Sequence, residues 1–174
     1  MNDADQVSLQ QGEILVWEEE RPVGEEKRFI LAMAVIDHPL QEVWDLIDDK
    51  EAIPLVIESV IKAEVVSRKG NTTVISQEVK GLGITRSAHY VVKHVGIFPH
   101  RVEFERVSGD FEHIEGQWLF ETLTGEDGAQ KTVLTYRLHL DAGKYVPQGL
   151  IIKSQLKKLP PIMTAIRARL ASAQ

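Results

Sequence analysis

Histidine is the residue type best suited to metal binding and acid–base chemistry near neutral pH, and the chain has six of them. His89 and His94 are five residues apart, which would put them on opposite faces of a regular strand. His113 and His139 read as outward-facing residues. There is no cysteine, no HExxH motif and no carboxylate–histidine cluster with ligand spacing. The sequence therefore predicts no metal site, no cofactor and no thiolate chemistry.

No familiar catalytic motif is present either. The chain has no recognisable Ser–His–Asp arrangement, no GxGxxG dinucleotide motif and no Walker-type phosphate loop. Gly81 and Gly83 flank one leucine and are typical of a turn rather than of a phosphate cradle. We therefore name no catalytic residue from the sequence.

A cation and a phenol in one β-rich run could hold a ligand. Arg86 and Tyr90 share a period-two phase with Ala88. If that phase points inward, Arg86 would be a buried cation that requires an anionic partner or a ligand carboxylate. The opposite phase would put Ser87 and His89 inside instead. The first phase is favoured because it is the more apolar, and the sequence leaves the second open.

The stretch over 147–172 has the spacing of an amphipathic helix that could cover such residues. Its apolar residues recur at steps of four and three: Ile152, Leu156, Leu159, Met163, Ile166 and Leu170. Two prolines, Pro160 and Pro161, remove N–H donors at an interior cost of about 3 kcal/mol or more each, so we expect a break or sharp kink near Leu159.

The basic residues of the same helix cover most of its other face. They are Lys153, Lys157, Lys158, Arg167 and Arg169. We interpret them as a solvated face. The alternative is transient contact with an anionic membrane surface during lipid delivery, which would be sensitive to salt.

Most of the remaining chain alternates with a period of two. Six such runs joined by short turns lie between residues 61 and 141, which predicts an antiparallel meander. Before them come a β-rich run over 27–36 and two short helical segments over 38–47 and 53–60. An additional strand and turn are expected over 13–26.

Length and composition indicate one globular domain. The 174 residues are 43% hydrophobic and 26% charged, and the net charge of −6 disfavours nucleic acid as a partner. Residues 1–12 are polar and lack the pattern of a signal peptide, so we expect a flexible N-terminus, one domain over 13–174 and a cytoplasmic location. No apolar run approaches the roughly 20 residues of a membrane span. The oligomeric state does not follow from the sequence.

The order of these elements resembles the START-like, or SRPBCC, superfamily, which includes polyketide cyclases/dehydrases and coenzyme-Q-binding proteins. The resemblance also rests on residues 38–45 (HPLQEVWD), on Gly116-Gln117-Trp118, on Thr135-Tyr136 and on Pro147 before the last helix. It implies an α+β helix-grip fold, in which a curved antiparallel sheet wraps around the C-terminal helix and leaves a cavity for a hydrophobic ligand. The segment before residue 27 and the double proline depart from this pattern.

Ten residues are our candidates for the ligand-binding site. The alternative is that they only fill a core. They are Arg86, Tyr90, Trp118, Phe120, Leu134, Tyr136 and Leu138 on strands, and Leu156, Leu159 and Met163 on the helix. Tyr90, Tyr136 or Arg86 would supply the polar contacts that orient a ligand.

Three functions are compatible with these residues. The first is binding or transport of a hydrophobic small molecule such as a lipid, a quinone or a polyketide-like aromatic, and the lack of a catalytic motif favours it over an enzyme. The second is a cyclase or dehydratase that acts in the same cavity, which convergence of at least two polar side chains on one void would favour. The third is a protein-interaction module whose cavity is filled, with an exposed apolar patch.

Overall fold

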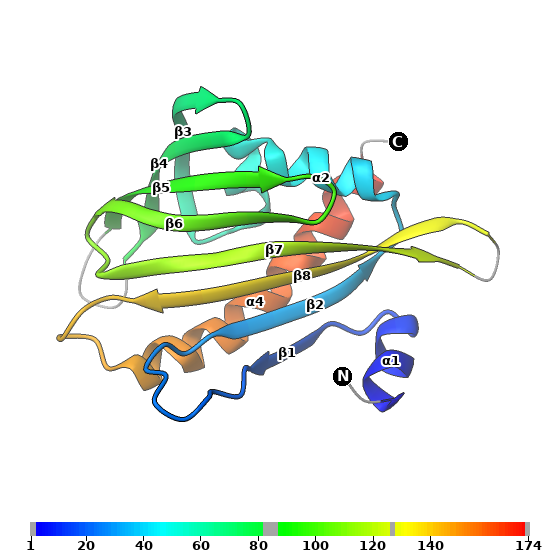
Figure 1. Cartoon of the computed structure of the whole chain (residues 1–174), viewed down its shortest axis with the longest axis horizontal. Coiled ribbons are helices and arrows are strands. Elements are labelled where there is room, and N and C mark those ends of the chain that lie inside the picture. Colours follow the sequence, from blue (N-terminus) through cyan, green and yellow to red (C-terminus); the bar gives the residue numbers. More distant parts are fainter. Residues whose placement is uncertain (1–2, 82–86, 126–127, 173–174) are drawn as a thin grey trace.

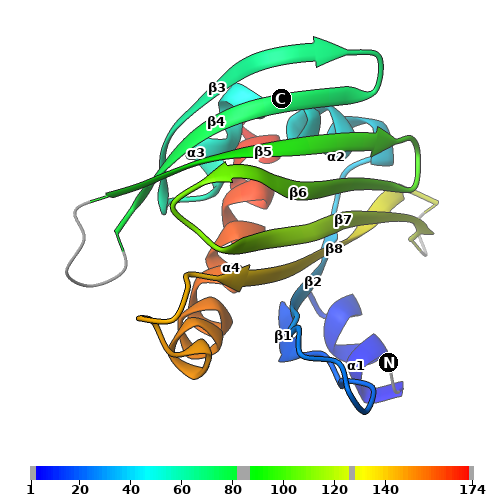
Figure 2. The same cartoon turned by 60° about the vertical axis from the view of Figure 1, so that its left-hand side comes forward.

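The computed structural model describes residues 3–81, 87–125 and 128–172, which form one curved sheet and four α-helices. The eight strands are antiparallel and lie in the order β1-β2-β8-β7-β6-β5-β4-β3, with the long helix α4 across the concave face (Figure 1, Figure 2). The architecture is the predicted α+β helix-grip fold. The strands are β1 Leu15–Glu18, β2 Ile30–Ile36, β3 Val60–Lys69, β4 Thr72–Lys80, β5 Ser87–Ile97, β6 Arg101–Gly109, β7 His113–Thr124 and β8 Gln130–Asp141.

The six strands from β3 to β8 are the predicted meander, in which each strand pairs with the next. β8 then pairs with β2, so the strand that precedes the meander lies beside the one that ends it. Gly109 ends β6 with φ of +118°. A Cβ there would overlap the backbone of β5 at His89 and Tyr90, so this reversal depends on glycine.

The strand register decides which side chains face α4. Gln77 on β4 lies opposite Tyr90 on β5, and His94 on β5 lies opposite Phe104 on β6. Because side chains alternate along a strand, Tyr90 and His94 share one face, and it is the concave one. The favoured phase is therefore the observed one for Tyr90. Arg86, its proposed cationic neighbour, lies outside the described residues.

Three short helical segments join β2 to the meander: α2 Leu40–Asp48, the 3-10 turn η1 Lys50–Ala52 and α3 Ile53–Val56. α2 follows Pro39 and buries Val43, Trp44 and Ile47. The second predicted segment is shorter than expected, because Ile57 adopts an extended conformation that leads into β3.

The helix α4 spans Gln148–Ala171 without interruption, although Pro160 and Pro161 lie inside it. The helix therefore has no break near Leu159, whereas the alternative expectation of a kink stays a prediction. The two prolines deprive the carbonyls of Leu156 and Lys157 of their intrahelical donors, and both residues are at least partly exposed, where water can replace the lost bonds. Burial of the helix on both sides of the prolines offsets the remaining cost.

Within the N-terminal segment, Asp3–Gln10 forms helix α1, and the flexibility expected for residues 1–12 stays a prediction. Leu9 is buried, which gives this segment an anchor that its polar composition conceals. Arg167 on α4 donates from Nη1 to the Gly12 carbonyl at 2.9 Å, and from Nε and Nη2 to the Val35 carbonyl. This arginine, expected on a solvated face, instead ties the helix to the start of the chain and to β2.

Candidate ligand-binding cavity

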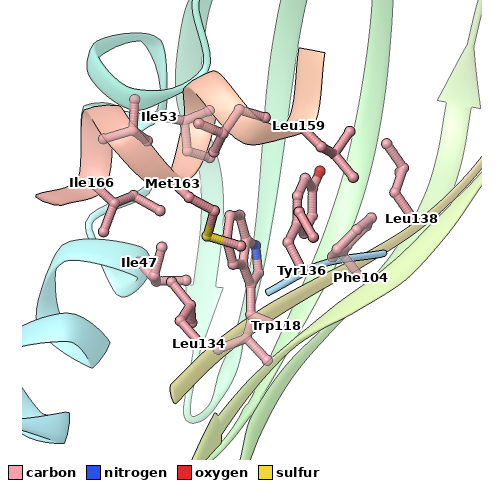
Figure 3. Close-up of a cluster of buried hydrophobic side chains, with 14 of the residues drawn as sticks. Ile47, Ile53, Phe104, Trp118, Leu134, Tyr136, Leu138, Leu159, Met163 and Ile166 are labelled. Atoms are coloured by element: carbon pink, nitrogen blue, oxygen red, sulfur yellow. The ribbon is translucent and has the colours of Figure 1, made fainter. Parts of the chain in front are cut away.

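The concave side of the sheet has a packed part, where α4 lies directly on the strands. Leu134, Leu159, Met163 and Ile166 are 0% exposed there. Figure 3 shows these side chains interlocking between helix and sheet. Phe120 continues the packed part, because its ring lies 5.0 Å from that of Trp44 on α2.

Beside this packed part lies a cavity of about 560 Å³. It is enclosed by α3, by one flank of α4 and by strands β4 to β8. Its volume is in the range of cavities that hold small molecules. The residues that line its apolar wall include Ile53, Val56, Val79, Val92, Phe104, Phe111, Ile114, Trp118, Leu138 and Ile162.

The cavity opens between α3 and α4, where its lining residues are exposed. Leu55 on α3 is 57% exposed, and Lys157 and Lys158 on α4 are exposed on the opposite side. Lys80 completes this rim and pairs with Glu58 at 3.0 Å. The opening therefore combines an exposed apolar side chain with positive charge.

Two buried polar side chains line the cavity on β4 and β5. Gln77 is 6% exposed and His94 is 7% exposed. The Nδ1 atom of His94 is buried and has no hydrogen-bond partner. Burial, reinforced by the positive charge of Lys50, lowers the pKa of His94 from 6.5 to about 3. The imidazole is therefore neutral at physiological pH, with one nitrogen as a donor and the other as an acceptor.

Two phenols also line the cavity. Tyr136 stacks on Trp118, with ring centroids 3.9 Å apart and planes 8° from parallel, and Tyr90 meets Phe111 edge to face at 5.3 Å. Trp118 and Tyr136 project from the strands toward α4 in Figure 3. Burial raises the pKa of both tyrosines, so each hydroxyl stays protonated and can donate a hydrogen bond.

A buried cation lies behind this wall. Lys50 on η1 is 2% exposed, and its Nζ donates to the Ile47 carbonyl at 2.9 Å and lies 3.4 Å from Asp48 Oδ1. Burial lowers the pKa of Lys50 to about 8, although the Asp48 carboxylate acts in the opposite direction. Lys50 does not line the cavity, and its ammonium is already bonded.

The structure separates the ten candidate residues into three groups. Tyr90, Trp118, Tyr136 and Leu138 line the cavity together. Arg86 lies outside the described residues. The remaining candidates pack in or against the core and do not line the cavity: Phe120, Leu134, Leu156, Leu159 and Met163.

The sequence reasoning missed Gln77 and His94. His94 has the same strand phase as Tyr90, so the phase that was favoured for Tyr90 also predicts an inward His94. The sequence analysis weighed the histidines for metal binding and acid–base chemistry and did not extend the phase of Tyr90 to His94. Gln77 follows Ile75 and precedes Val79 in an alternating run, which is a signal for an inward polar residue. His139, expected to face outward, is buried at the convex face, where its Nδ1 lies 2.9 Å from the Arg28 carbonyl oxygen.

Among the described residues there is no group of three or more His, Cys, Asp or Glu side chains placed to hold a metal ion. No helix within the described ranges is both long and apolar enough to cross a membrane.

Comparison with known proteins is consistent with the fold and with the cavity. Residues 36–165 match the family model described as polyketide cyclase/dehydrase and lipid transport. No curated protein sequence matches the chain.

Solved structures give the same architecture. A STAR-related lipid transfer protein from Xanthomonas axonopodis superposes with a TM-score of 0.73 at 15% identity, covering 91% of this chain and 93% of that one. The Zhui aromatase/cyclase from a Streptomyces species gives 0.71 at 14% identity, with 84% and 94% covered. Human StAR-related lipid transfer protein 5 gives 0.69 at 13% identity, with 92% and 83% covered. At these identities the likeness establishes the fold alone.

Proposed function

Because the chain belongs to the polyketide cyclase/dehydrase and lipid transport family of START-like proteins, we propose that it binds a hydrophobic small molecule in the cavity beside α4. The observation that carries this proposal is the cavity of about 560 Å³ lined mainly by apolar side chains. Such a void in a protein interior loses dispersion contacts and is retained at a cost in stability. A guest molecule would restore those contacts.

The expected affinity depends on more than apolar contact. Burying about 300 Å² of apolar ligand surface yields on the order of 7 kcal/mol, whereas association costs an estimated 4 to 15 kcal/mol. Apolar burial alone therefore gives weak binding. The tyrosine hydroxyls and the polar groups of Gln77 and His94 are placed where they can add hydrogen bonds and orientation.

A second candidate function is a cyclase or dehydratase reaction in the same cavity. It is favoured by the convergence of four polar side chains on one void: Gln77, Tyr90, His94 and Tyr136. Protonated phenols can polarise a carbonyl group, and a neutral imidazole can accept a hydrogen bond from a substrate or donate one to it. The third function considered, an interaction module with a filled cavity, finds no support in a void of this volume.

The rim supports transient contact with an anionic membrane surface as part of a carrier function. Lys157 and Lys158 lie across the opening of the cavity from the exposed Leu55. Basic side chains are attracted to anionic lipid headgroups, and a neighbouring apolar side chain can enter the acyl boundary.

Native mass spectrometry of freshly purified protein, followed by solvent extraction, tests the proposed function. We expect a recurrent small hydrophobic mass that disappears on denaturation. Incubation of the stripped protein with lipids, quinones and polyketide-like aromatics should restore an adduct. Repeated failure to detect any adduct across this panel would contradict ligand binding. Release of a cyclised or dehydrated product from a poly-ketone substrate would favour the enzyme over the carrier.

A further inference from the structure

We propose that His94 forms a polar subsite for an uncharged oxygen-bearing group, a hydroxyl or a carbonyl, of an otherwise apolar ligand. This inference rests on the proposed function and adds a ligand class to it. It starts from an unusual feature of the cavity wall, which is a buried imidazole nitrogen without a partner.

The strand register fixes where His94 lies on the wall. His94 lies opposite Thr73 on β4, whereas Gln77 is four residues further along β4 on the same face, roughly 13 Å away along the strand. Both side chains line the cavity and are buried. Among the described residues, His94 Nδ1 is a buried atom without a hydrogen-bond partner, so the subsite is built on His94.

Partners are normally found for such groups, because a buried polar group without one costs about 1 to 3 kcal/mol. The ring of His94 stacks on Phe104, with centroids 5.6 Å apart and planes 30° apart. This contact and the burial of the ring restrict the orientation of the imidazole. A ligand that supplies the missing hydrogen bond recovers the cost of the orphaned atom.

The chemistry of His94 favours an uncharged group. A neutral imidazole provides one acceptor and one donor, which suits a hydroxyl or a carbonyl. A carboxylate would need a free cation to compensate for its lost hydration. Lys50, the cation that acts on His94, is already bonded to the Ile47 carbonyl and to Asp48.

The positive charges that do line the cavity lie elsewhere. Lys80, Lys157 and Lys158 are exposed at the rim. The cavity therefore has an uncharged polar wall on β4 and β5 and a basic mouth between α3 and α4. A ligand that carries both kinds of group would bind with its neutral oxygen inside and its anionic group at the mouth.

A matched series of twelve-carbon compounds tests the inference. Dodecane, 1-dodecanol, 2-dodecanone and dodecanoate would compete with a fluorescent apolar probe bound to the full chain. We expect the alcohol and the ketone to displace the probe at about tenfold lower concentration than dodecane, which corresponds to one hydrogen bond of about 1.4 kcal/mol. Any gain by dodecanoate should survive the loss of the His94 imidazole, because the lysines at the mouth would hold its carboxylate.

Two phenylalanine variants assign the effect to the subsite. His94→Phe keeps an aromatic ring against Phe104 but removes both nitrogens, so the advantage of dodecanol over dodecane should fall to about onefold with dodecane unaffected. His89→Phe is the matched control, because His89 lies on the same strand with its side chain exposed on the opposite face. It should keep the advantage. Circular dichroism and thermal unfolding confirm that each variant is folded.

A spectroscopic measurement on the unmodified protein provides a second readout. The Nδ1 resonance of His94 should shift when dodecanol binds and should stay in place when dodecane binds. Equal binding of dodecane and dodecanol, an unchanged dodecanol advantage in His94→Phe, or an unperturbed Nδ1 resonance would overturn the inference while the proposed function stands. Failure of every compound to displace the probe would overturn both.

Discussion

The two sides of α4 meet the same sheet in opposite ways. On one side Leu159, Met163 and Ile166 pack without gaps against β2 and β8. On the other, Gln155, Ala165 and their neighbours face a void bounded by α3 and strands β4 to β8. The sheet curves away from the helix on that side (Figure 2). The apolar face of α4 therefore stabilises the fold, whereas one flank of α4 and strands β4 to β8 form the cavity wall.

The largest effect should come from truncating the packed side. Leu159→Ala should lower the free energy of unfolding by about 2 to 5 kcal/mol, because it removes buried methyl groups and leaves a new cavity. Ile162→Ala, on the cavity side of the same helix, should cost less, since it enlarges a void that already exists. Urea unfolding of both variants measures the difference, and equal costs would mean that the two sides are equally packed.

The pH dependence of the free energy of unfolding should reveal the buried His94 on the cavity wall. The pKa of His94 is lowered to about 3 in the folded chain, so between pH 6.5 and 3 the unfolded state binds one more proton than the folded state. Stability is then lost as pH falls, by about 1.4 kcal/mol per pH unit from this group. His94→Phe should lose stability less steeply over this range in urea titrations. Identical slopes for the two proteins would contradict a buried neutral imidazole.

Gly116 should be needed where the cavity wall meets the sheet. A Cβ at this position would overlap the Arg137 carbonyl and lie 2.6 Å from Phe104 Cζ. Gly116→Ala should therefore cost about 1 to 3 kcal/mol and push the Phe104 ring toward the void. Gly149→Ala is the control, because a Cβ there meets nothing within 4 Å, and in helix α4 alanine should be neutral or stabilising. Thermal unfolding distinguishes the two variants. An unchanged stability of Gly116→Ala would show that the cavity wall is packed less tightly than its contacts indicate.

The smallest effect should come from the rim. The double substitution Lys157→Gln and Lys158→Gln should weaken binding to anionic vesicles by up to about 2 kcal/mol, and the loss should shrink at high salt. The pair Lys153→Gln and Arg169→Gln removes the same charge from positions that do not line the cavity. Vesicle co-sedimentation should show a smaller loss for this second pair. Equal losses would indicate a general charge effect rather than contact at the mouth.

Much of the fold follows from local patterns in the sequence. Period-two alternation predicts the meander, and the apolar stripe of 147–172 predicts the helix that covers it. Proline costs alone do not predict how α4 behaves, because burial of Leu159 and Met163 on either side of the double proline outweighs them. Leu9 shows the same limit, since one buried side chain anchors a segment of polar composition.

The cavity was harder to predict than the fold. A helical stripe shows which side chains are apolar, but it does not show how far the sheet stands from each side of the helix. Leu159 and Met163 have the right phase to face the sheet and are packed against it, whereas Ala165 on the flank faces the void. The strand phase that predicts an inward Tyr90 also predicts an inward His94. Its missing partner depends on tertiary packing, which no local pattern reveals.

The most direct test of the central claim, that the space beside α4 receives a hydrophobic ligand, is to fill it. Ala165→Trp should occupy the void, whereas Ala168→Trp adds the same ring to an exposed position three residues along the same helix. Titration of a fluorescent apolar probe into both variants is the measurement. The account predicts that Ala165→Trp loses at least about tenfold in affinity, equivalent to 1.4 kcal/mol, with Ala168→Trp unchanged. Undiminished binding by a folded Ala165→Trp variant would contradict it.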